Sequence, residues 1–333
     1  MPDLGCDMLR RRDFIILLSG AGLLPRIARA QSSSKIPHLG FLGVTVASSW
    51  ASRLEALRSG LRGLGYEQDK NIIIEDLWAE EHYDRLPALA AELVRRKVDI
   101  ILTYGTPGTL AAKRATTEIP IVFVYAGDAV GAELVSSLSR PEANVTGNTY
   151  FLPELMAKRL ELLKDAIPHI TRVAVLIKPD NPLFKATLPV IQRAADTLKV
   201  KLQQFDARGP NEFEPAIAAM VKNRIEGVVI QEDAVYLTNL RLLIDLAAKQ
   251  SLPIASSGEF GEAGALIAYG ADFHEMCRHA ALFVDKILRG IKPADLPVDR
   301  ATKFETVLNL RVAKTLGVSV PPMALLRADR VIE

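Results

Sequence analysis

The sequence predicts an α/β protein of two similar lobes, each with a parallel sheet covered by helices. Short apolar, β-branched runs alternate with amphipathic helical patterns from residue 36 onward, which is typical of parallel sheets with helices on both faces. The same order of elements begins again near residue 172. The length of 333 residues also suits about two domains of ordinary size.

The first half of the chain contains four strand patterns and three helical patterns. The strands are expected at residues 36–44, 71–78, 99–104 and 119–125, and the helices at 48–66, 83–98 and 107–116. Pro107 would fall in the first turn of the third helix, a position where proline is tolerated.

The second half repeats this order and then adds a tail. Strands are expected at residues 172–177, 201–207, 226–231 and 252–257, and helices at 183–200, 212–224 and 236–250. The tail adds strands at 265–270 and 302–310 and helices at 272–290 and 311–317, and we expect it to cross back between the lobes.

Two segments indicate that the halves are copies of one domain. Residues 98–124 and 225–257 both run acid, apolar strand, loop, helix, Ile/Leu-Pro-Ile and strand. Asp99 then corresponds to Glu226, and Pro120 to Pro253, which favours a duplicated domain over a short solenoid repeat. The alternative is that any two α/β segments look alike at this level of detail.

Residues 10–31, RRRDFIILLSGAGLLPRIARAQ, have the three parts of an export signal. A basic start leads into an apolar stretch from Phe14 to Leu24, and small residues follow at Ala28-Arg29-Ala30. The apolar stretch is about 11 residues, shorter than the roughly 20 that span a bilayer. Glycines and a proline interrupt it, which disfavours a first helix of the fold. We therefore expect residues 1–30 to be a signal peptide that is cleaved after Ala30.

The start of this segment resembles the twin-arginine signal. Arg11-Arg12-Asp13-Phe14-Ile15 has paired arginines before a polar residue, a phenylalanine and an aliphatic residue. General secretory export remains the alternative, and either Met1 or Met8 could be the first residue. Because no cysteine lies beside the cleavage site, we expect a free, soluble periplasmic protein rather than a lipoprotein.

The charge and the cysteine content limit the classes of partner and the disulfide bonds that we expect. The formal net charge is +2, and without residues 1–30, which carry five arginines and three aspartates, it becomes zero. A nearly neutral chain without a basic tract gives no reason to expect nucleic acid or an anionic membrane as partner. Cys277 is the single cysteine outside the signal peptide, where Cys6 lies, so no disulfide within the mature chain is possible. We expect Cys277 to be a buried apolar residue.

The motifs of common enzyme classes are absent from the sequence. The five histidines, His38, His82, His169, His274 and His279, include no pair with the i, i+4 spacing of a zinc site. There is no GxSxG nucleophile motif, no P-loop and no dinucleotide fingerprint. We therefore expect no catalysis, no cofactor and no metal.

The loops after the predicted strands instead offer small polar groups and aromatic rings. In open α/β sheets, ligands bind at the carboxyl ends of parallel strands. The loop from Thr103 to Thr109 precedes a helix N-terminus, which suits a carboxylate or another anion. Thr106 could equally well only cap its own helix. Trp50, Tyr125 and Tyr236 could stack on a planar ligand.

Two long stretches resemble the ABC transporter substrate-binding protein family. The first is TPGTLAAKRATTEIPIVFVYAGDAVGAELVSSLSRPEANVTGNT, from Thr106 to Thr149, and the second runs from Ala294 to Glu333. The resemblance covers essentially the whole mature chain. Ala129 stands where the family usually has Pro, and Glu142-Ala143 stand where it usually has Gly-Gly. The first departure puts the identity of the ligand in doubt rather than the fold.

The resemblance implies a type I periplasmic-binding-protein fold with two lobes joined by a three-stranded hinge. The N-terminal lobe would hold residues 36–148 plus about 270–292, and the C-terminal lobe 149–269 plus about 300–333. The resemblance and the strand-end loops together predict this set of ligand-binding residues: Thr45, Ser49, Trp50, Thr103, Gly105, Thr106, Pro107, Tyr125, Asp128, Asn148, Tyr150, Lys178, Asn181, Gln231, Asp233, Tyr236 and Ser256.

The expected function is capture of a small organic ligand, an aromatic amino acid or a related aromatic or carboxylate compound. The ligand would be held between the lobes by hinge closure and delivered to an ABC permease in the inner membrane by a monomeric protein. Two alternatives remain open: a two-lobed α/β enzyme such as a racemase or transferase, and a sensor that hands its ligand to a membrane receptor.

Overall fold

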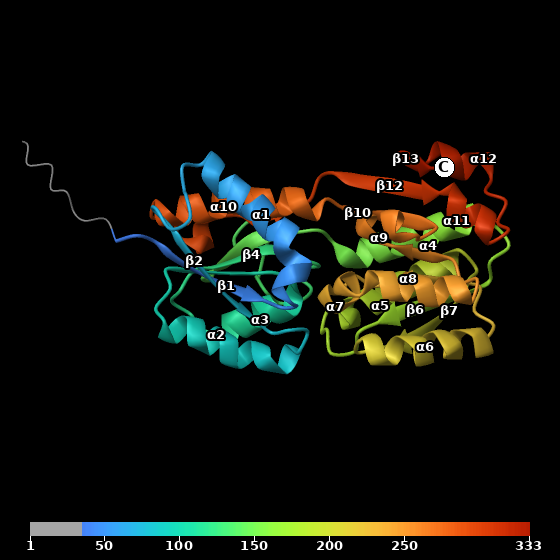
Figure 1. Cartoon of the computed structure of the whole chain (residues 1–333), viewed down its shortest axis with the longest axis horizontal. Helices are drawn as coiled ribbons and strands as arrows, with labels where there is room; N and C mark the ends of the chain where they lie inside the picture. Colours follow the sequence, from blue (N-terminus) through green and yellow to red (C-terminus); the bar gives the residue numbers. More distant parts are fainter. Residues whose placement is uncertain (1–34) are drawn as a thin grey trace, which may run out of the picture. The chain divides into compact units, whose positions relative to one another are not determined.

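The computed structural model describes residues 35–333, so the predicted signal peptide lies outside the described residues. Residues 36–333 form one unit that contains two sheets (Figure 1). None of the helices within the described residues is long and apolar enough to cross a membrane.

The first sheet has six parallel strands in the order β11-β5-β4-β3-β1-β2. Its strands are β1 (His38–Gly43), β2 (Ile73–Trp78), β3 (Ile100–Thr103), β4 (Ile121–Ala126), β5 (Val145–Thr149) and β11 (Asp299–Arg300). Helix α1 (Ala47–Gly63) packs beside α10 (Phe273–Leu288), and α2 (Leu86–Arg95) packs beside α3 (Gly105–Ala115). A short 3₁₀ helix, η1 (Tyr83–Arg85), precedes α2, and another, η2 (Pro293–Asp295), follows α10. We call this sheet and its helices the N-terminal lobe.

The second sheet has seven strands in the order β13-β12-β10-β9-β8-β6-β7. They are β6 (Arg172–Ile177), β7 (Lys201–Asp206), β8 (Gly227–Ile230), β9 (Ile254–Ser256), β10 (Ile267–Ala271), β12 (Phe304–Asn309) and β13 (Arg330–Ile332), and only the β10–β12 pair is antiparallel.

Eight helices accompany the second sheet in residues 35–333, and with it they form the C-terminal lobe. They are α4 (Leu152–Ala166), α5 (Phe184–Thr197), α6 (Pro210–Lys222), α7 (Ala234–Thr238), α8 (Leu240–Lys249), α9 (Gly258–Ala263), α11 (Leu310–Thr315) and α12 (Pro322–Leu326). Helix α4 packs against α5, and α6 packs against α8.

The chain passes between the lobes three times. It leaves the first sheet after β5, returns after β10 and leaves again after β11, so residues 149–152, 271–273 and 300–304 make the three crossings. The tail therefore crosses back between the lobes, as predicted. Helix α10 follows a strand of the second sheet but packs on α1 and β4 (Figure 1).

The residues that indicated a duplicated domain occupy equivalent places in the two lobes. The carboxylate of Asp99 accepts a hydrogen bond from the backbone N–H of His38 (2.8 Å), and that of Glu226 accepts one from Thr171 (2.7 Å). Both acids thus hold the start of the first strand of their lobe. The backbone oxygens of Pro120 and Pro253 likewise accept from the neighbouring strand in each lobe.

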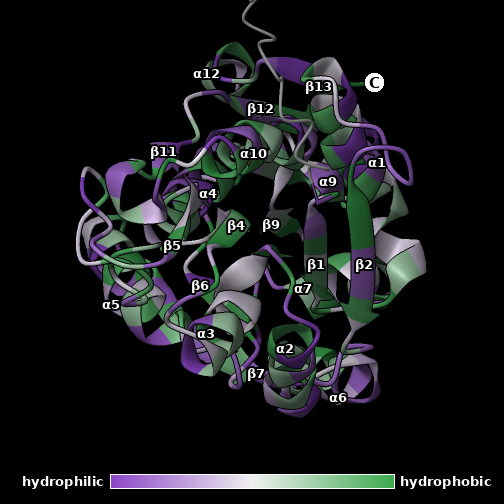
Figure 2. Ribbon diagram, turned by 90° about the vertical axis from the view of Figure 1, so that its left-hand side faces the viewer, coloured by the Kyte–Doolittle hydropathy of each residue, from purple (hydrophilic) through white to green (hydrophobic). Residues whose placement is uncertain are grey.

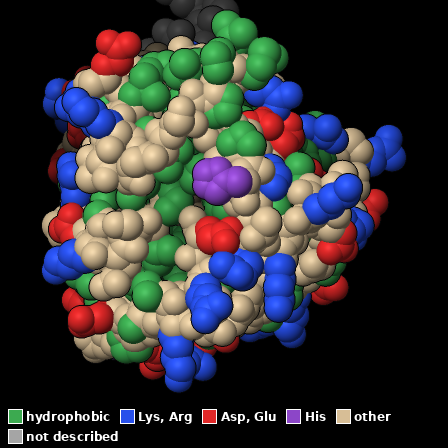
Figure 3. Space-filling view, turned by 90° about the vertical axis from the view of Figure 1, so that its right-hand side faces the viewer, with side chains coloured by type: hydrophobic (Ala, Val, Ile, Leu, Met, Phe, Trp, Pro, Cys, Tyr) green, Lys and Arg blue, Asp and Glu red, His purple; other side chains and the backbone are tan. Residues whose placement is uncertain are grey.

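Each lobe is built around the apolar strands at the centre of its sheet. All residues of β3, β4 and β8 are buried, and Figure 2 shows β4 in the hydrophobic colour among helices of mixed colour. On the face that Figure 3 shows, basic and acidic side chains are interspersed among apolar ones. Cys277 is fully buried, as predicted, and burial raises the pKa of its thiol.

Candidate functional site

The carboxyl ends of both sheets face one small cavity between the lobes. The cavity has a volume of about 30 Å³, which is room for about two water molecules. A molecule much larger than water does not fit in the cavity as it stands. The lining residues come from both lobes and two crossings: Val44, Tyr83, Tyr104, Gly105, Thr106, Pro107, Tyr125, Gly127, Tyr150, Asn181, Leu183, Glu232, Asp233, Ala234, Leu237 and Phe273.

Aromatic rings form one side of this cavity. Tyr125 stacks on Phe273 with the ring centroids 4.6 Å apart, and Tyr150 meets both rings edge-on. Tyr104 also lines the cavity. Its ring stacks on the ring of Trp50, which lies outside the lining, with the centroids 4.4 Å apart. Such a set of rings offers flat apolar surface to a planar or cationic ligand.

Asp233 brings a buried carboxylate to the cavity from the C-terminal lobe. It is 3% exposed, and burial raises its pKa above the usual aspartate value. It accepts hydrogen bonds from the side chain of Asn181 (2.9 Å), the backbone of Val235 (2.9 Å) and the hydroxyl of Tyr83. Asp233 forms no ion pair within residues 35–333. Three donors leave room for one more on a carboxylate that accepts about four.

Within residues 35–333, the bond from Tyr83 to Asp233 is one of four side-chain hydrogen-bonded pairs that join the lobes. The Oη of Tyr83 lies 2.8 Å from each carboxylate oxygen. The other three contacts pair Ser49 with Thr238, Glu81 with Asn239, and Arg53 with Glu259. Burial and the neighbouring Asp233 raise the pKa of Tyr83, so its hydroxyl keeps its hydrogen and remains a donor.

The N-terminus of α3 faces the same cavity from the N-terminal lobe. Gly105 begins the helix at φ +69°, a left-handed backbone that favours glycine. Neither Tyr104, at the N-cap, nor Thr106 caps the helix with its side chain, and the buried Oγ1 of Thr106 has no hydrogen-bond partner within the described residues. Free backbone N–H groups and an unpartnered hydroxyl at a helix N-terminus suit a carboxylate.

A second carboxylate, Glu232, lines the cavity but is already paired. The guanidinium of Arg159 binds both of its oxygens, and the two side chains are almost fully buried. Arg159 also donates to the backbone oxygen of Tyr269 (2.7 Å). This pair holds α4 to the carboxyl end of β8 and leaves Asp233 as the unpaired charge beside it.

Unpartnered buried polar atoms concentrate where the lobes meet. Within residues 35–333, six buried side-chain atoms have no hydrogen-bond partner, and they belong to Arg53, Thr106, Gln231, Ser257 and Glu259. Buried polar groups are nearly always paired in folded proteins, so such a set calls for an explanation.

The predicted binding residues fall into two groups. Seven line the cavity between the lobes: Gly105, Thr106, Pro107, Tyr125, Tyr150, Asn181 and Asp233. The other ten lie outside its lining: Thr45, Ser49, Trp50, Thr103, Asp128, Asn148, Lys178, Gln231, Tyr236 and Ser256.

Most residues of the second group use their polar atoms within the protein. Trp50 donates to the hydroxyl of Tyr125 (3.2 Å), and Tyr236 donates to the backbone oxygen of Ala207 (2.6 Å). The hydroxyls of Thr103 and Ser256 donate to backbone oxygens of neighbouring strands. Similar local bonds engage Thr45, Ser49, Asp128 and Lys178.

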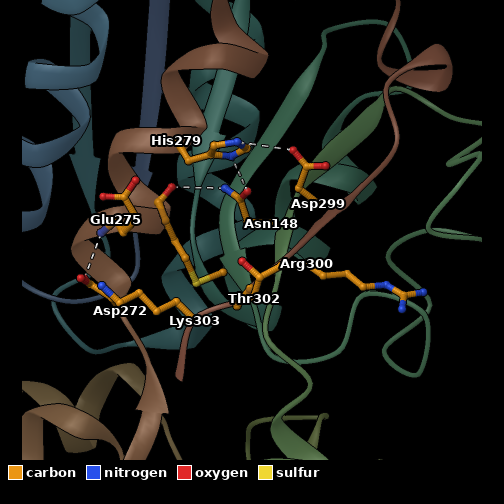
Figure 4. A pocket seen from close by; sticks show the side chains of 10 residues that line it. Asn148, Asp272, Glu275, His279, Asp299, Arg300, Thr302 and Lys303 are labelled. Atoms are coloured by element: carbon orange, nitrogen blue, oxygen red, sulfur yellow. Dashed lines mark hydrogen bonds and ion pairs between the residues drawn. The ribbon is translucent and has the colours of Figure 1, made fainter. Parts of the chain in front are cut away.

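Asn148 lies at a different hollow, on the hinge. Its amide donates to the backbone oxygens of Val124 (2.8 Å) and Met276 (3.2 Å), and its oxygen lies 3.0 Å from Nδ1 of His279 (Figure 4). The hollow beside it has a volume of about 460 Å³ and lies between α10 and the crossing at residues 300–303. Groups of three or more His, Cys, Asp or Glu that could hold a metal are absent from the described part of the chain.

The sequence analysis did not single out several residues that build the site. Tyr83, Tyr104, Glu232 and Phe273 line the cavity, and Arg53 crosses the lobe interface. Tyr104 and Glu232 stand directly beside predicted residues at strand ends, so the strand-end rule could have found them. Tyr83 and Phe273 lie outside those loops, and their partners are far away in the sequence.

Two α/β lobes with a polar and aromatic cavity between the carboxyl ends of their sheets define a two-lobed binding protein. The model of the ABC transporter substrate-binding protein family matches residues 44–332, and the chain belongs to this family. Proteins of this family bind small molecules and work with ABC permeases. The predicted type I periplasmic-binding-protein fold is thereby confirmed.

Named relatives and solved structures agree with this assignment. The chain is 25% identical over 300 residues to the tyrosine-binding protein of Clostridioides difficile, covering 90% of this chain and 85% of that one. A conserved domain protein of Vibrio cholerae has a TM-score of 0.83 at 25% identity, covering 89% of this chain and 100% of that chain. A domain of Streptococcus pneumoniae in complex with L-tryptophan has a TM-score of 0.82 at 23% identity, covering 90% and 100%.

Proposed function

We propose that this protein captures an amino acid with an aromatic side chain in the cleft between its lobes and delivers it to an ABC permease without chemical change. The lobes would be residues 36–148 plus about 270–292, and 149–269 plus about 300–333. Hinge closure would enclose the ligand.

The observation that carries this proposal is that one cavity is lined by two groups that complement the two charged ends of an amino acid. The unpaired carboxylate of Asp233, in the C-terminal lobe, suits a protonated amine. The N-terminus of α3, with the free hydroxyl of Thr106, suits a carboxylate. A free amino acid carries both charges, so it would connect the two lobes and favour closure.

The aromatic lining supports a ligand with an aromatic side chain. Tyr104, Tyr125, Tyr150 and Phe273 offer ring surface in the same cavity as Asp233 and the N-terminus of α3. The names of the C. difficile tyrosine-binding protein and of the L-tryptophan complex favour the same class of ligand.

The proposed place of work is the periplasm. Residues 10–30 carry the features of an export signal, and the mature protein would begin at Gln31 as a free monomer. The transient partner would be a permease of the inner membrane.

Native mass spectrometry of freshly purified protein, followed by a thermal-shift panel on refolded, ligand-free protein, tests the proposal. A ligand at 100 times its Kd stabilises the folded state by about 2.7 kcal/mol. We expect aromatic L-amino acids to raise the Tm and to be recovered unchanged. Conversion of the amino acid by the protein would instead favour a racemase or transferase. If none of the aromatic amino acids raised the Tm, the ligand class would be wrong.

A further inference from the structure

The proposed binding of an amine by Asp233 and of a carboxylate by the N-terminus of α3 does not explain four polar side chains near the lobe interface. They are Arg53, Gln231, Ser257 and Glu259, and none of them lines the cavity described above. Gln231 and Ser257 are each 1% exposed, and Arg53 is 7% exposed. Both amide atoms of Gln231, Oγ of Ser257, Nε of Arg53 and Oε1 of Glu259 lack partners within residues 35–333.

These side chains come together at the carboxyl ends of two adjacent strands. Strand β8 pairs with β9 in parallel, with Val228 beside Ile254 and Val229 beside Ala255. Continuing this register places Gln231 beside Ser257, and the bond from Ser256 Oγ to the backbone oxygen of Ile230 (3.2 Å) agrees with it.

The N-terminal lobe supplies the other side of this cluster. Arg53, on α1, reaches across to the carboxylate of Glu259, two residues after Ser257. Its Nη1 also contacts the backbone oxygen of Ser49 (3.4 Å). The pair of Arg53 and Glu259 thus joins the lobes beside Ser257 and forms only when they close.

The position of the cluster relates it to the amine-binding end. Asp233 follows β8 by three residues, and Ser257 follows β9 directly. Gln231 lies two residues before Asp233 at the end of the same strand, and Ser257 lies about one strand spacing, roughly 4.8 Å, along the sheet edge from β8. This separation is comparable with the distance from the α-carbon of an aromatic amino acid to the end of its side chain.

The chemistry of the cluster restricts what it can bind. Leaving a buried polar atom without a partner is unfavourable, so the unpartnered atoms of these side chains favour a ligand that satisfies them. Gln231 and Ser257 each offer a donor and an acceptor. Arg53 and Glu259 neutralise each other, so a second net charge on the ligand gains little. The matching group is neutral and both donates and accepts a hydrogen bond.

We propose that Arg53, Gln231, Ser257 and Glu259 form a second polar subsite of the cleft, which selects an amino acid whose side chain ends in a neutral hydrogen-bonding group such as a phenolic hydroxyl. This inference rests on the proposed function, because the amino-acid end must first be held by Asp233 and the N-terminus of α3.

Calorimetric titration with L-tyrosine and L-phenylalanine tests the subsite, since these probes differ by one hydroxyl. The wild-type protein should bind L-tyrosine at least about tenfold more tightly, because a site built to bond a hydroxyl rejects the analogue that lacks it. Gln231→Met and Ser257→Ala should each weaken L-tyrosine binding at least about fivefold and change L-phenylalanine binding less than about twofold.

The matched control is Gln204→Met, on the exposed side of β7, where the amide donates to Asp206. It should leave both affinities unchanged. Equal affinities of wild-type protein for the two probes, or variants that weaken both equally, would overturn the subsite while leaving the proposed function intact. If neither probe nor L-tryptophan bound to the wild-type protein, the proposed function would fail and the subsite with it; binding of L-tryptophan alone would overturn only the subsite. L-phenylalanine binding also shows that each variant is folded.

Discussion

Tyr83 of the N-terminal lobe donates its hydroxyl hydrogen to the carboxylate of Asp233 in the C-terminal lobe, with its Oη 2.8 Å from both carboxylate oxygens. The two residues are 150 positions apart in the sequence. The contact therefore joins the residue proposed to hold the ligand's amine to the lobe that must move to release it.

Replacing Tyr83 with Phe should weaken the closed state and therefore ligand binding. A hydrogen bond to a charged group contributes about 1.5–3 kcal/mol, which corresponds to a loss of roughly 10- to 150-fold in affinity. Calorimetric titration measures the loss. Tyr66→Phe is the control, because its hydroxyl donates to Asp285 (3.0 Å) away from the cavity. A wild-type affinity in Tyr83→Phe would show that the contact does not contribute to closure.

Asp233→Asn should remove the charge that holds the amine. We expect affinity for an aromatic amino acid to fall at least about 30-fold, since removing one partner of a buried charge pair costs about 2–5 kcal/mol. The Tm of the ligand-free protein should stay the same or rise, because burial without an ion pair opposes the ionised form. Loss of affinity together with a large drop in Tm would instead mark Asp233 as a structural residue.

Ligand affinity should depend on pH through Asp233. Its pKa is raised in the folded protein, so affinity should fall as the pH decreases through this raised value, at a higher pH than for an ordinary aspartate. The stability of the ligand-free protein should change in the opposite direction and decrease as the pH rises. The stability contributed by Asp233 is fully present below the unfolded pKa and is lost as pH rises through the folded pKa. Titrations and Tm measurements between about pH 4 and 8 check both, and Asp233→Asn should abolish both effects.

Arg159→Met should destabilise the protein strongly, because it leaves Glu232 buried without its partner. We expect a loss of about 3–5 kcal/mol in the free energy of unfolding, measured by urea denaturation. The double variant with Glu232→Leu should recover much of this loss. Arg172→Met, which breaks an exposed pair with Glu226, should cost at most about 1 kcal/mol. Equal losses in the two single variants would contradict the importance of burial.

The export segment can be tested separately, since it lies outside the described residues. Replacing Arg11 and Arg12 with Lys should stop export through the twin-arginine route, and N-terminal sequencing of the exported wild-type protein should begin at Gln31. Unchanged export of the double variant would favour the general secretory route.

The sequence predicted the fold well because local patterns determine most of it. The buried strands, the helices between them and the equivalent roles of Asp99 and Glu226 all followed from short segments. The strand-end rule likewise located Gly105, Thr106, Tyr125, Asn181 and Asp233 at the cavity.

Residue type alone did not separate the aromatic residues that line the cavity from Trp50 and Tyr236, which lie outside its lining. Trp50 shares the buried face of α1 with Leu54, Leu57 and Leu61, and this helical spacing would have placed it against its own sheet. Tyr236 packs edge-on against Phe213 within the C-terminal lobe. The rings that do line the cavity include Tyr83 and Phe273, whose positions depend on closure of the lobes and on the second crossing. No local pattern contains that information.

The central claim is that one cavity recognises both charged ends of an amino acid. Calorimetric titration of refolded, ligand-free protein with L-phenylalanine, phenethylamine and 3-phenylpropionate tests it most directly. We predict measurable binding of L-phenylalanine and at least about 100-fold weaker binding of each analogue, because each lacks one of the two ends. Equal affinity for either analogue and L-phenylalanine would show that Asp233 or the N-terminus of α3 does not hold the ligand as described.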